Sequence, residues 1–125
     1  EQARLCALLD RAESLGMVVM AEVRTPEEAD RALAAGVSVV AVNSWTFDTN
    51  DLQRGAFAEI APGLPSEIIK ISLGGVRGVR DLMDAASCGA DAVLAAEAIM
   101  SGEDIFTATR KLAAAGQHPS CPSRR

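Results

Sequence analysis

Short, mainly apolar runs alternate with amphipathic stretches along this chain of 125 residues. The runs span residues 17–23, 39–43, 68–73 and 91–96, and the first of them begins with an unbroken apolar stretch, Met17 to Ala21. Unbroken apolar runs are typical of strands that are buried on both faces, as in parallel sheets. The pattern therefore predicts four parallel strands separated by helices.

Helix-capping signals support this alternation. Leucines at helical spacing predict a first helix over residues 2–15, which Gly16 ends. Thr25, Pro26 and Glu28 form the pattern of a capping box with proline in the first turn, so we expect a helix from there to about Ala35. A last helix is predicted over about 103–115. Strands that alternate with helices indicate a parallel sheet with right-handed crossovers.

An internal repeat refines the fold class. The segment from Val23-Arg24 to Val42 aligns with the segment from Val76-Arg77 to Ala95 at an offset of about 53 residues. Two βα pairs related in this way favour half of a barrel over a doubly wound sheet. We therefore predict an α/β fold with four parallel βα units, half of a (β/α)₈ TIM barrel.

Domain boundaries follow from the same pattern. Residues 1–116 are predicted to form one half-barrel. Residues 117–125 are rich in proline and serine, and we expect a disordered or loosely attached tail there. Because the chain starts at Glu1 rather than at methionine, apparently in mid-element, we expect it to be a fragment of a longer protein.

Composition excludes several classes of partner. The net charge is -5 and the isoelectric point is about 4.8, which disfavours nucleic acid as a ligand. No apolar run is long enough to cross a membrane. The chain has an odd number of cysteines at wide spacing and a single histidine, so we expect no zinc site. We also expect no cofactor. Reduced cysteines suit the cytoplasm, or a plastid in a photosynthetic eukaryote.

Candidate chemistry lies where the predicted strands end, because ligands of parallel α/β folds bind at the carboxyl ends of the strands. Glu22 closes the first strand and is a candidate acid or base, and Asn43 closes the second. Gly74 and Gly75 follow the third strand, and Ala96 with Glu97 follows the fourth. The last four positions could present backbone N–H groups to a phosphate.

Each candidate also has a purely structural interpretation. Glu22 could be a solvated strand-end carboxylate or could pair with Arg24. Asn43 could be a turn former, and the paired glycines a tight turn. The aromatic residues Trp45 and Phe47 could plug the barrel rim or support an aromatic ligand.

At these same positions the chain resembles the indole-3-glycerol phosphate synthase family. The segment Leu15–Val23 resembles the motif of the family's fifth strand, an apolar run into Glu-Val, and Ala41–Ser44 resembles its Gly-Ile-Asn-Asn. Ile71–Arg77 resembles its Ser-Glu-Ser-Gly-Ile, and Asp91–Met100 its Ala-Phe-Leu-Val-Gly-Glu-Ala-Leu-Met. The match runs from about Leu15 to Ala115 with the motifs in the right order, which makes this the C-terminal half of the barrel.

The resemblance implies a metal-free lyase in tryptophan biosynthesis. Such an enzyme closes the ring of a carboxyanilino deoxyribulose phosphate, releases carbon dioxide and loses water. The resemblance assigns acid/base catalysis to Glu22 and substrate positioning to Asn43. It assigns phosphate binding to the ends of the last two strands, at Gly74, Gly75, Ala96 and Glu97.

Several family residues differ in this chain. Leu73 stands where the family has a glutamate, Gly74 where it has a serine and Ala96 where it has a glycine. Trp45 replaces an arginine. The two essential lysines of the family lie in the first half of the barrel, and Lys70 cannot replace them because its strand parity places it on the helix side.

Two functions therefore remain open. The first is a fragment of a synthase-like lyase, and the second is a degenerate, non-catalytic barrel module that binds a phosphorylated ligand or pairs with another half-barrel. A relative of phosphoribosylanthranilate isomerase fits the fold but lacks the residue matches. In either case we expect a phosphorylated small molecule as ligand, and self-association through exposed sheet edges.

Overall fold

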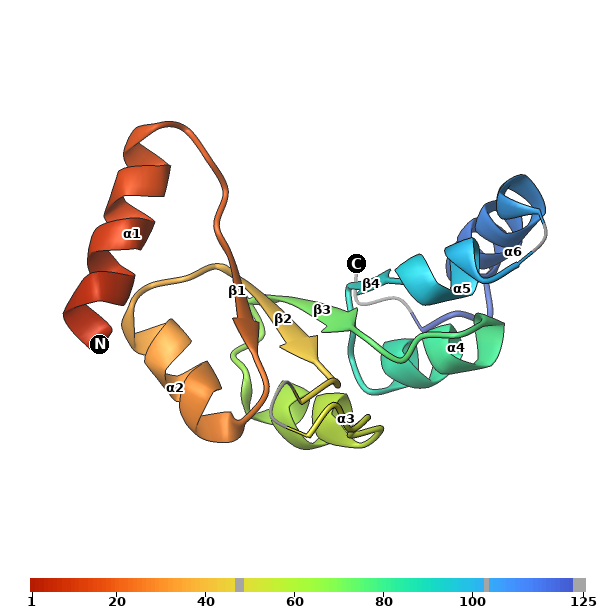
Figure 1. Cartoon of the computed structure of the whole chain (residues 1–125), viewed down its shortest axis with the longest axis horizontal. Helices are drawn as coiled ribbons and strands as arrows, with labels where there is room; N and C mark the ends of the chain where they lie inside the picture. The colour runs from red at the N-terminus through yellow and green to blue at the C-terminus, as the bar shows by residue number, and fades with distance from the viewer. Residues whose placement is uncertain (47–48, 103, 123–125) are drawn as a thin grey trace.

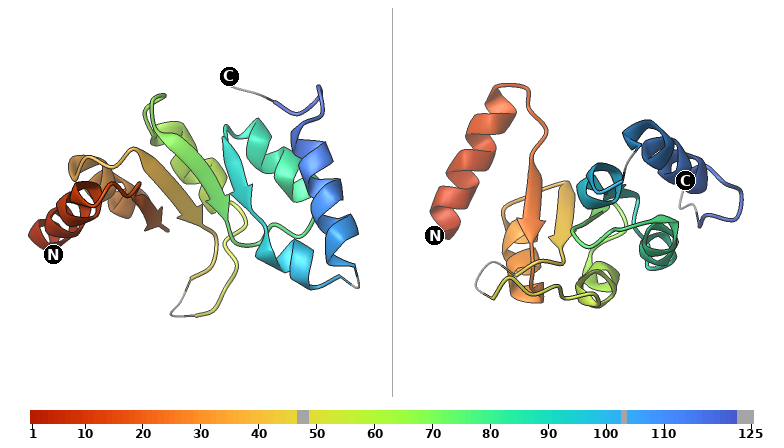
Figure 2. Two further views of the ribbon diagram at one scale, coloured as in Figure 1. Left: turned by 90° about the horizontal axis from the view of Figure 1, so that it is seen from above. Right: turned by 45° about the vertical axis from the view of Figure 1, so that its right-hand side comes forward.

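The chain folds into one parallel sheet whose connecting helices lie along one side of it. In a computed structural model, residues 1–46, 49–102 and 104–122 are described. Figures 1 and 2 show helices and strands alternating along the chain. The elements are α1 (Gln2–Ser14), β1 (Met20–Val23), α2 (Pro26–Ala34), β2 (Val39–Asn43), α3 (Ala56–Ile60), β3 (Ile69–Leu73), α4 (Val79–Ser87), β4 (Ala92–Leu94), α5 (Ala96–Met100) and α6 (Ile105–Gly116), with a 3₁₀ turn at Ala61–Gly63.

The four described strands pair in chain order, and every pairing is parallel. Met20 lies opposite Val39, Val39 opposite Ile69, and Ile71 opposite Ala92. The order β1-β2-β3-β4 leaves β1 and β4 as the two edges of this sheet. The predicted parallel sheet of four βα units is therefore confirmed.

The two edge strands are shorter than predicted. β1 begins at Met20 rather than at residue 17, because its ladder to β2 starts with the Met20–Val39 pair. Val18, in the unpaired apolar stretch before it, is 81% exposed. β4 covers only Ala92–Leu94, since the Asp91 carboxylate accepts a hydrogen bond from the Lys70 N–H at 2.9 Å and Ala96 already belongs to α5. An edge strand has only one neighbouring strand to pair with, so the length of its apolar run overestimates the length of the strand.

The apolar core lies between the sheet and its helices. Val23, Val40 and Val42 are the largest side chains that are almost completely buried. They pack with residues of α2 and α3, including Ala29, Ala32, Phe57 and Ile60. β2 is buried along its whole length because it lies between two strands and packs against α3.

The predicted repeat is present in the helix caps. α2 and α4 both contain nine residues and lie 53 positions apart. The N–H of Arg24 donates to Glu28 at 2.7 Å, and the N–H of Arg77 donates to Asp81 at 2.9 Å. Gly36 and Gly89 follow the two helices with positive φ angles of 89° and 95°. The two units therefore enter and leave their helices in the same way.

The opposite side of the sheet is the inner face of the half-barrel, and much of it is uncovered. Met20, Glu22 and Leu94 point to this side by strand alternation, and all three are exposed. At the chain end, residues 117–122 form turns, with the Cys121 N–H donating to the His118 carbonyl at 2.8 Å. Residues 123–125 lie outside the described residues, as does the predicted start of the last helix at Glu103. The proposed boundary at residue 116 stays a prediction.

Candidate active site

Register brings the first two candidate side chains together. Glu22 pairs with Ala41, and Asn43, two residues further along β2, points to the same inner face. The Asn43 side-chain amide Nδ2 donates to Glu22 Oε1 at 2.9 Å. A carboxylate and an amide from neighbouring strands are thus held together at the carboxyl end of the sheet.

Arg24 holds the same carboxylate from the other side. Its Nη2 atom donates to Glu22 Oε1 in a short ion pair, and its Nε atom donates to the carbonyl oxygen of Trp45 at 3.2 Å. The ion pair between Glu22 and Arg24, one of the structural interpretations, is therefore present. The Glu22 side chain is 38% exposed. Its Oε1 atom is engaged twice, whereas Oε2 has no partner among the described residues.

Asn43 contacts the candidate catalytic carboxylate and also shapes a turn, as its two interpretations predicted. Besides donating to Glu22, its Oδ1 atom accepts the backbone N–H of Trp45 at 2.9 Å, which shapes the turn after β2. The side chain is buried. We call Glu22, Arg24, Asn43 and Trp45 the strand-end network. The sequence pointed to all four residues, but it did not show that Arg24 would bridge β1 to the loop after β2.

The glycine pair after β3 lies against this network. Gly74 and Gly75 have positive φ angles of 80° and 73°, a conformation that favours glycine. A Cβ atom on Gly74 would lie 2.7 Å from both Asn43 Oδ1 and Trp45 Cδ1, and one on Gly75 would lie 2.6 Å from Leu52 Cδ1. Trp45 and Leu52 form an isolated antiparallel bridge. Trp45 therefore packs at the rim, whereas Phe47 lies outside the described residues.

The second predicted phosphate segment begins a short helix. β4 ends at Leu94, opposite Leu73, so Ala96 and Glu97 follow the strand next to the one that Gly74 follows. Ala96 and Glu97 are exposed in the first turn of α5, so the expectation that the strand reaches residue 96 was wrong. The phosphate-binding roles of Gly74, Gly75, Ala96 and Glu97 stay predictions.

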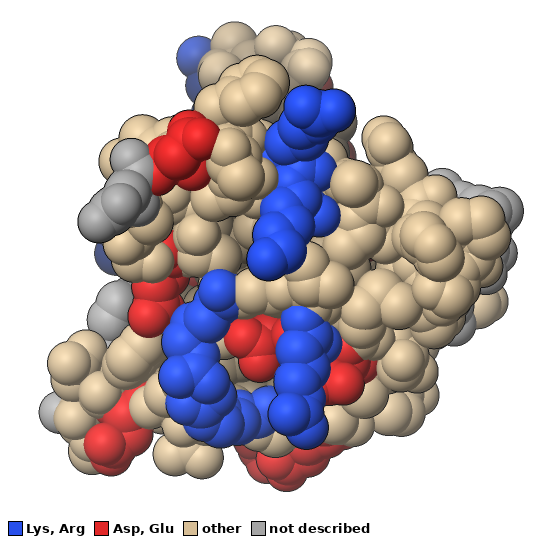
Figure 3. All heavy atoms as spheres, turned by 90° about the vertical axis from the view of Figure 1, so that its right-hand side faces the viewer, with Lys and Arg blue, Asp and Glu red and all other residues tan. Residues whose placement is uncertain are grey.

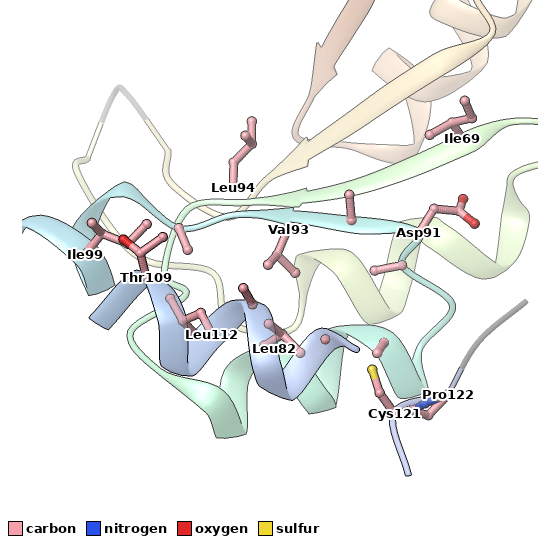
Figure 4. Close-up of a pocket in the computed structure, with 16 residues that line it drawn as sticks. Ile69, Leu82, Asp91, Val93, Leu94, Ile99, Thr109, Leu112, Cys121 and Pro122 are labelled. Carbon is pink, nitrogen blue, oxygen red and sulfur yellow. The ribbon is translucent and has the colours of Figure 1, made fainter. Parts of the chain in front are cut away.

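A separate apolar cavity of about 680 Å³ lies beside the open edge of the sheet. Figure 4 shows Val93 of β4 pointing toward Leu82 of α4 and Leu112 of α6, with Cys121 and Pro122 at one end. Its lining is mainly aliphatic and contains no residue of the strand-end network. This cavity therefore lies apart from the predicted chemistry at the strand ends.

The described ranges lack the features of a metal centre and of a membrane span. No cluster of three or more His, Cys, Asp or Glu side chains in those ranges could hold a metal ion. None of the helices described is long and apolar enough to cross a membrane. The three cysteines are free thiols. The expectation of a site without metal or cofactor stays a prediction.

Fold and strand-end polar groups together define the class of protein to which this half-barrel belongs. Solved structures with a similar fold are TIM-barrel enzymes. They include a mandelate oxidase mutant (TM-score 0.73, 19% identity, 98% of this chain and 43% of that one) and thiamine phosphate pyrophosphorylase from Pyrococcus furiosus (0.72, 20%, 88% and 52%). At such identities the likeness shows the fold alone, which is that of a partial (β/α)₈ barrel.

The family follows from the sequence comparison. The model of the indole-3-glycerol phosphate synthase family matches residues 1–112, and the chain belongs to this family. The synthases of Mycobacteroides abscessus and Mycobacterium tuberculosis are each 52% identical to it over 122 residues, and that of Saccharopolyspora erythraea is 51% identical. These matches cover 98% of this chain and 45% of each relative. The chain thus spans less than half the length of these relatives.

Proposed function

We propose that this chain supplies the C-terminal half of an indole-3-glycerol phosphate synthase active site. The substrate is a carboxyanilino deoxyribulose phosphate, and the reaction comprises ring closure, loss of carbon dioxide and loss of water. The observation that carries the proposal is the 2.9 Å hydrogen bond between Asn43 and Glu22 at the strand ends, because it pairs the two side chains to which the resemblance assigns the chemistry.

In this proposal the Glu22 carboxylate transfers a proton, and Asn43 holds that carboxylate in position. Asn43 and Arg24 both donate to Oε1 of Glu22, so the carboxylate is fixed through one oxygen. Oε2 then remains to accept a proton from the substrate during dehydration. Ring closure also needs a proton donor, and the resemblance assigns that role to lysines of the first half of the barrel. We therefore expect this chain to be inactive by itself.

The substrate phosphate would bind across the ends of β3 and β4. Backbone N–H groups of Gly74 and Gly75, and those of the turn that starts at Ala96 and Glu97, are the candidate donors. The family's serine hydroxyl is missing at Gly74, which removes one hydrogen bond, about 1 kcal/mol of binding free energy.

Complementation tests the catalytic proposal. The purified chain is mixed with the N-terminal half of the Mycobacteroides abscessus synthase, and indole formation is followed by fluorescence with the anilino substrate. Activity should appear only in the mixture, and Glu22→Gln should lower it by roughly 10²–10⁴-fold. Glu59→Gln, an exposed glutamate on α3, is the matched control and should leave activity unchanged. Equal activity of the Glu22→Gln mixture would disprove the role of Glu22.

A degenerate module is the alternative, and two residues favour it. Leu73 places an apolar side chain where the family has a glutamate, and Trp45 packs against Gly74 where the family has an arginine. If the two halves of the Mycobacteroides abscessus synthase regain activity when mixed but this chain does not, the binding module is the better interpretation. Leu73→Glu would then be the variant to test for recovery.

Association is the remaining part of the proposal. β1 and β4 are edge strands, and Met20 and Leu94 are exposed on the inner face. We expect the isolated chain to form dimers or larger assemblies that cover this face, in a reducing compartment such as the cytoplasm. Sedimentation that shows a folded monomer across a wide concentration range would contradict this.

A further inference from the structure

A second cavity, of about 440 Å³, lies on the helix side of the sheet, between α3 and α4. Ser72 of β3 lines it, and Ser72 alternates with Ile71 and Leu73, which point to the inner face. The cavity therefore opens on the other side of the sheet from Glu22. Its lining residues come from β3, α3, α4 and the loops next to them. We call it the α3–α4 groove.

Two serines that are more than nine-tenths buried border the groove. Ser72 is 5% exposed and Ser44 is 6% exposed, and both line the cavity. Neither side-chain hydroxyl has a hydrogen-bond partner within the described parts of the chain. Among the described residues, no fully buried side-chain nitrogen or oxygen lacks a hydrogen-bond partner, so these two hydroxyl oxygens are not fully enclosed and can be reached by solvent. These two are thus available to a molecule that enters the groove.

The charged side chains of the groove are mainly basic. Arg54, Arg77 and Arg80 line it together with Asp81 and Asp84. Arg77 lies 4.0 Å from Asp81, whereas Arg54 and Arg80 form no ion pair with any residue that the structure describes. Figure 3 shows basic side chains on both sides of acidic ones on the face of the molecule that carries α4 and α6. The groove has an excess of positive charge in a chain whose net charge is negative.

Helix stability does not account for Arg80. It lies in the first turn of α4, where the helix dipole disfavours a positive charge. The equivalent position in the first βα unit is Glu27, in the first turn of α2, which is the favourable choice. Arg80 therefore destabilises α4 through the helix dipole, whereas Glu27 stabilises α2.

From these observations we infer that the α3–α4 groove is a second anion site, which binds the phosphate group of a small phosphorylated molecule. The guanidinium groups of Arg54 and Arg80 would each donate two hydrogen bonds to the phosphate oxygens. The hydroxyls of Ser44 and Ser72 would donate to the same phosphate group. Gly74 and Gly75 also line the groove, so it adjoins the proposed strand-end phosphate site, but its arginine and serine side chains are not those of the strand-end network. The inference therefore does not rest on the proposed catalytic function.

Titration with inorganic phosphate tests the inference, with backbone amide shifts of the full chain as the readout. We expect shifts at Ser72, Arg77 and Arg80, and at least tenfold weaker binding in the double variant Arg54→Gln/Arg80→Gln. Ser72→Ala should weaken binding by a smaller factor. Arg110→Gln, on α6 and outside the groove, is the charge-matched control and should bind like the parent.

A reciprocal variant separates this site from the strand-end phosphate site. Ala96→Glu places a negative charge where the proposed catalytic site would hold its phosphate, and it leaves the groove untouched. Groove binding should persist in Ala96→Glu and be lost in the double arginine variant. The opposite result, or equal phosphate affinity in the double variant and the parent, would overturn the inference while leaving the catalytic proposal standing.

Discussion

The first and third βα units have the same frame but differ in chemistry. In both units, an arginine N–H donates to an acidic side chain four residues later, Glu28 in the first and Asp81 in the third. Both helices have the same length. β1, however, continues to Val23, whereas β3 ends at Leu73 and is followed by two glycines in left-handed conformation. The backbone frame is repeated while the residues at the strand end are free to differ.

The equivalent arginines of the two units, Arg24 and Arg77, make different contacts. Arg24 turns back to Glu22 and to the Trp45 carbonyl, so it stabilises the strand-end network. Arg77 remains more exposed, 4.0 Å from Asp81, and lines the α3–α4 groove. One sequence element, Val-Arg before a capped helix, thus serves the inner face in one unit and the helix side in the other.

The largest effect should come from Gly74, where the third unit departs most from the first. Gly74→Ser restores the family residue, but its Cβ atom would lie 2.7 Å from both Asn43 and Trp45 at a φ of 80°. Left-handed strain and overpacking together should lower the free energy of unfolding by about 2–4 kcal/mol. Urea unfolding followed by far-UV circular dichroism measures the loss.

Gly36 provides the matched control for that substitution. Its φ is 89°, and a Cβ atom there would meet nothing within 4 Å, so Gly36→Ser should show the backbone cost alone, about 1 kcal/mol. Adding Trp45→Ala to Gly74→Ser should recover part of the loss. Equal destabilisation by the two serine variants would show that Trp45 does not constrain position 74.

A middle-sized effect should come from the paired caps. Glu28→Ala and Asp81→Ala each remove the acceptor of one backbone N–H, and each should lower the free energy of unfolding by about 1 kcal/mol. Thermal and urea unfolding would measure both, with Glu13→Ala on α1 as an exposed control. A clear difference between the two variants in the loss of unfolding free energy would show that the two caps are not equivalent.

A smaller effect of opposite sign is expected at Arg80. Arg80→Glu gives the first turn of α4 a second acidic residue beside Asp81, as α2 has in Glu27 and Glu28, so the free energy of unfolding should rise by about 0.3–1 kcal/mol. The same variant should lose the increase in melting temperature that phosphate gives the parent. A destabilised variant would indicate that Arg80 has a structural role.

The smallest effect concerns pH and Glu27. Hydrogen bonds from its own backbone N–H and from the Thr25 hydroxyl lower the pKa of Glu27. A carboxyl whose pKa is lower in the folded state contributes stability above its unfolded pKa, about 4.3, and this contribution is lost as the pH falls through the lowered value. Glu27→Gln should therefore be less stable than the parent at pH 6, and the difference should shrink toward pH 3. A constant difference would exclude this linkage.

Much of the fold could be predicted because local signals agreed with one another. The capping residues at Thr25 and the glycines at Gly36 and Gly89 gave helix ends that differ little from those observed. Parity correctly placed Lys70 on the helix side, where it is 3% exposed. Strand ends at the sheet edges were predicted less well, since apolar content does not reveal whether a neighbouring strand is present.

The candidate site was predictable in its members but not in its contacts. Glu22 and Asn43 stood out because parallel strands bring their carboxyl ends to one edge. The bridge from Arg24 to the Trp45 carbonyl depends on a loop conformation, and no residue pattern encodes it. The α3–α4 groove was missed for a similar reason, because Arg54, Ser72 and Arg80 come together only once the segments before α3 and α4 have folded onto the sheet.

The packing of Trp45 against Gly74 has a practical consequence for spectroscopy. Trp45 is the single tryptophan of the chain, which contains no tyrosine. Emission excited near 295 nm therefore arises from the rim of the candidate site and from nowhere else. Its indole ring lies within contact of the loop that would bind phosphate and beside the Asn43 amide. Trp45 is thus an intrinsic fluorescent probe, and its emission wavelength and intensity should change when a ligand binds at the strand ends.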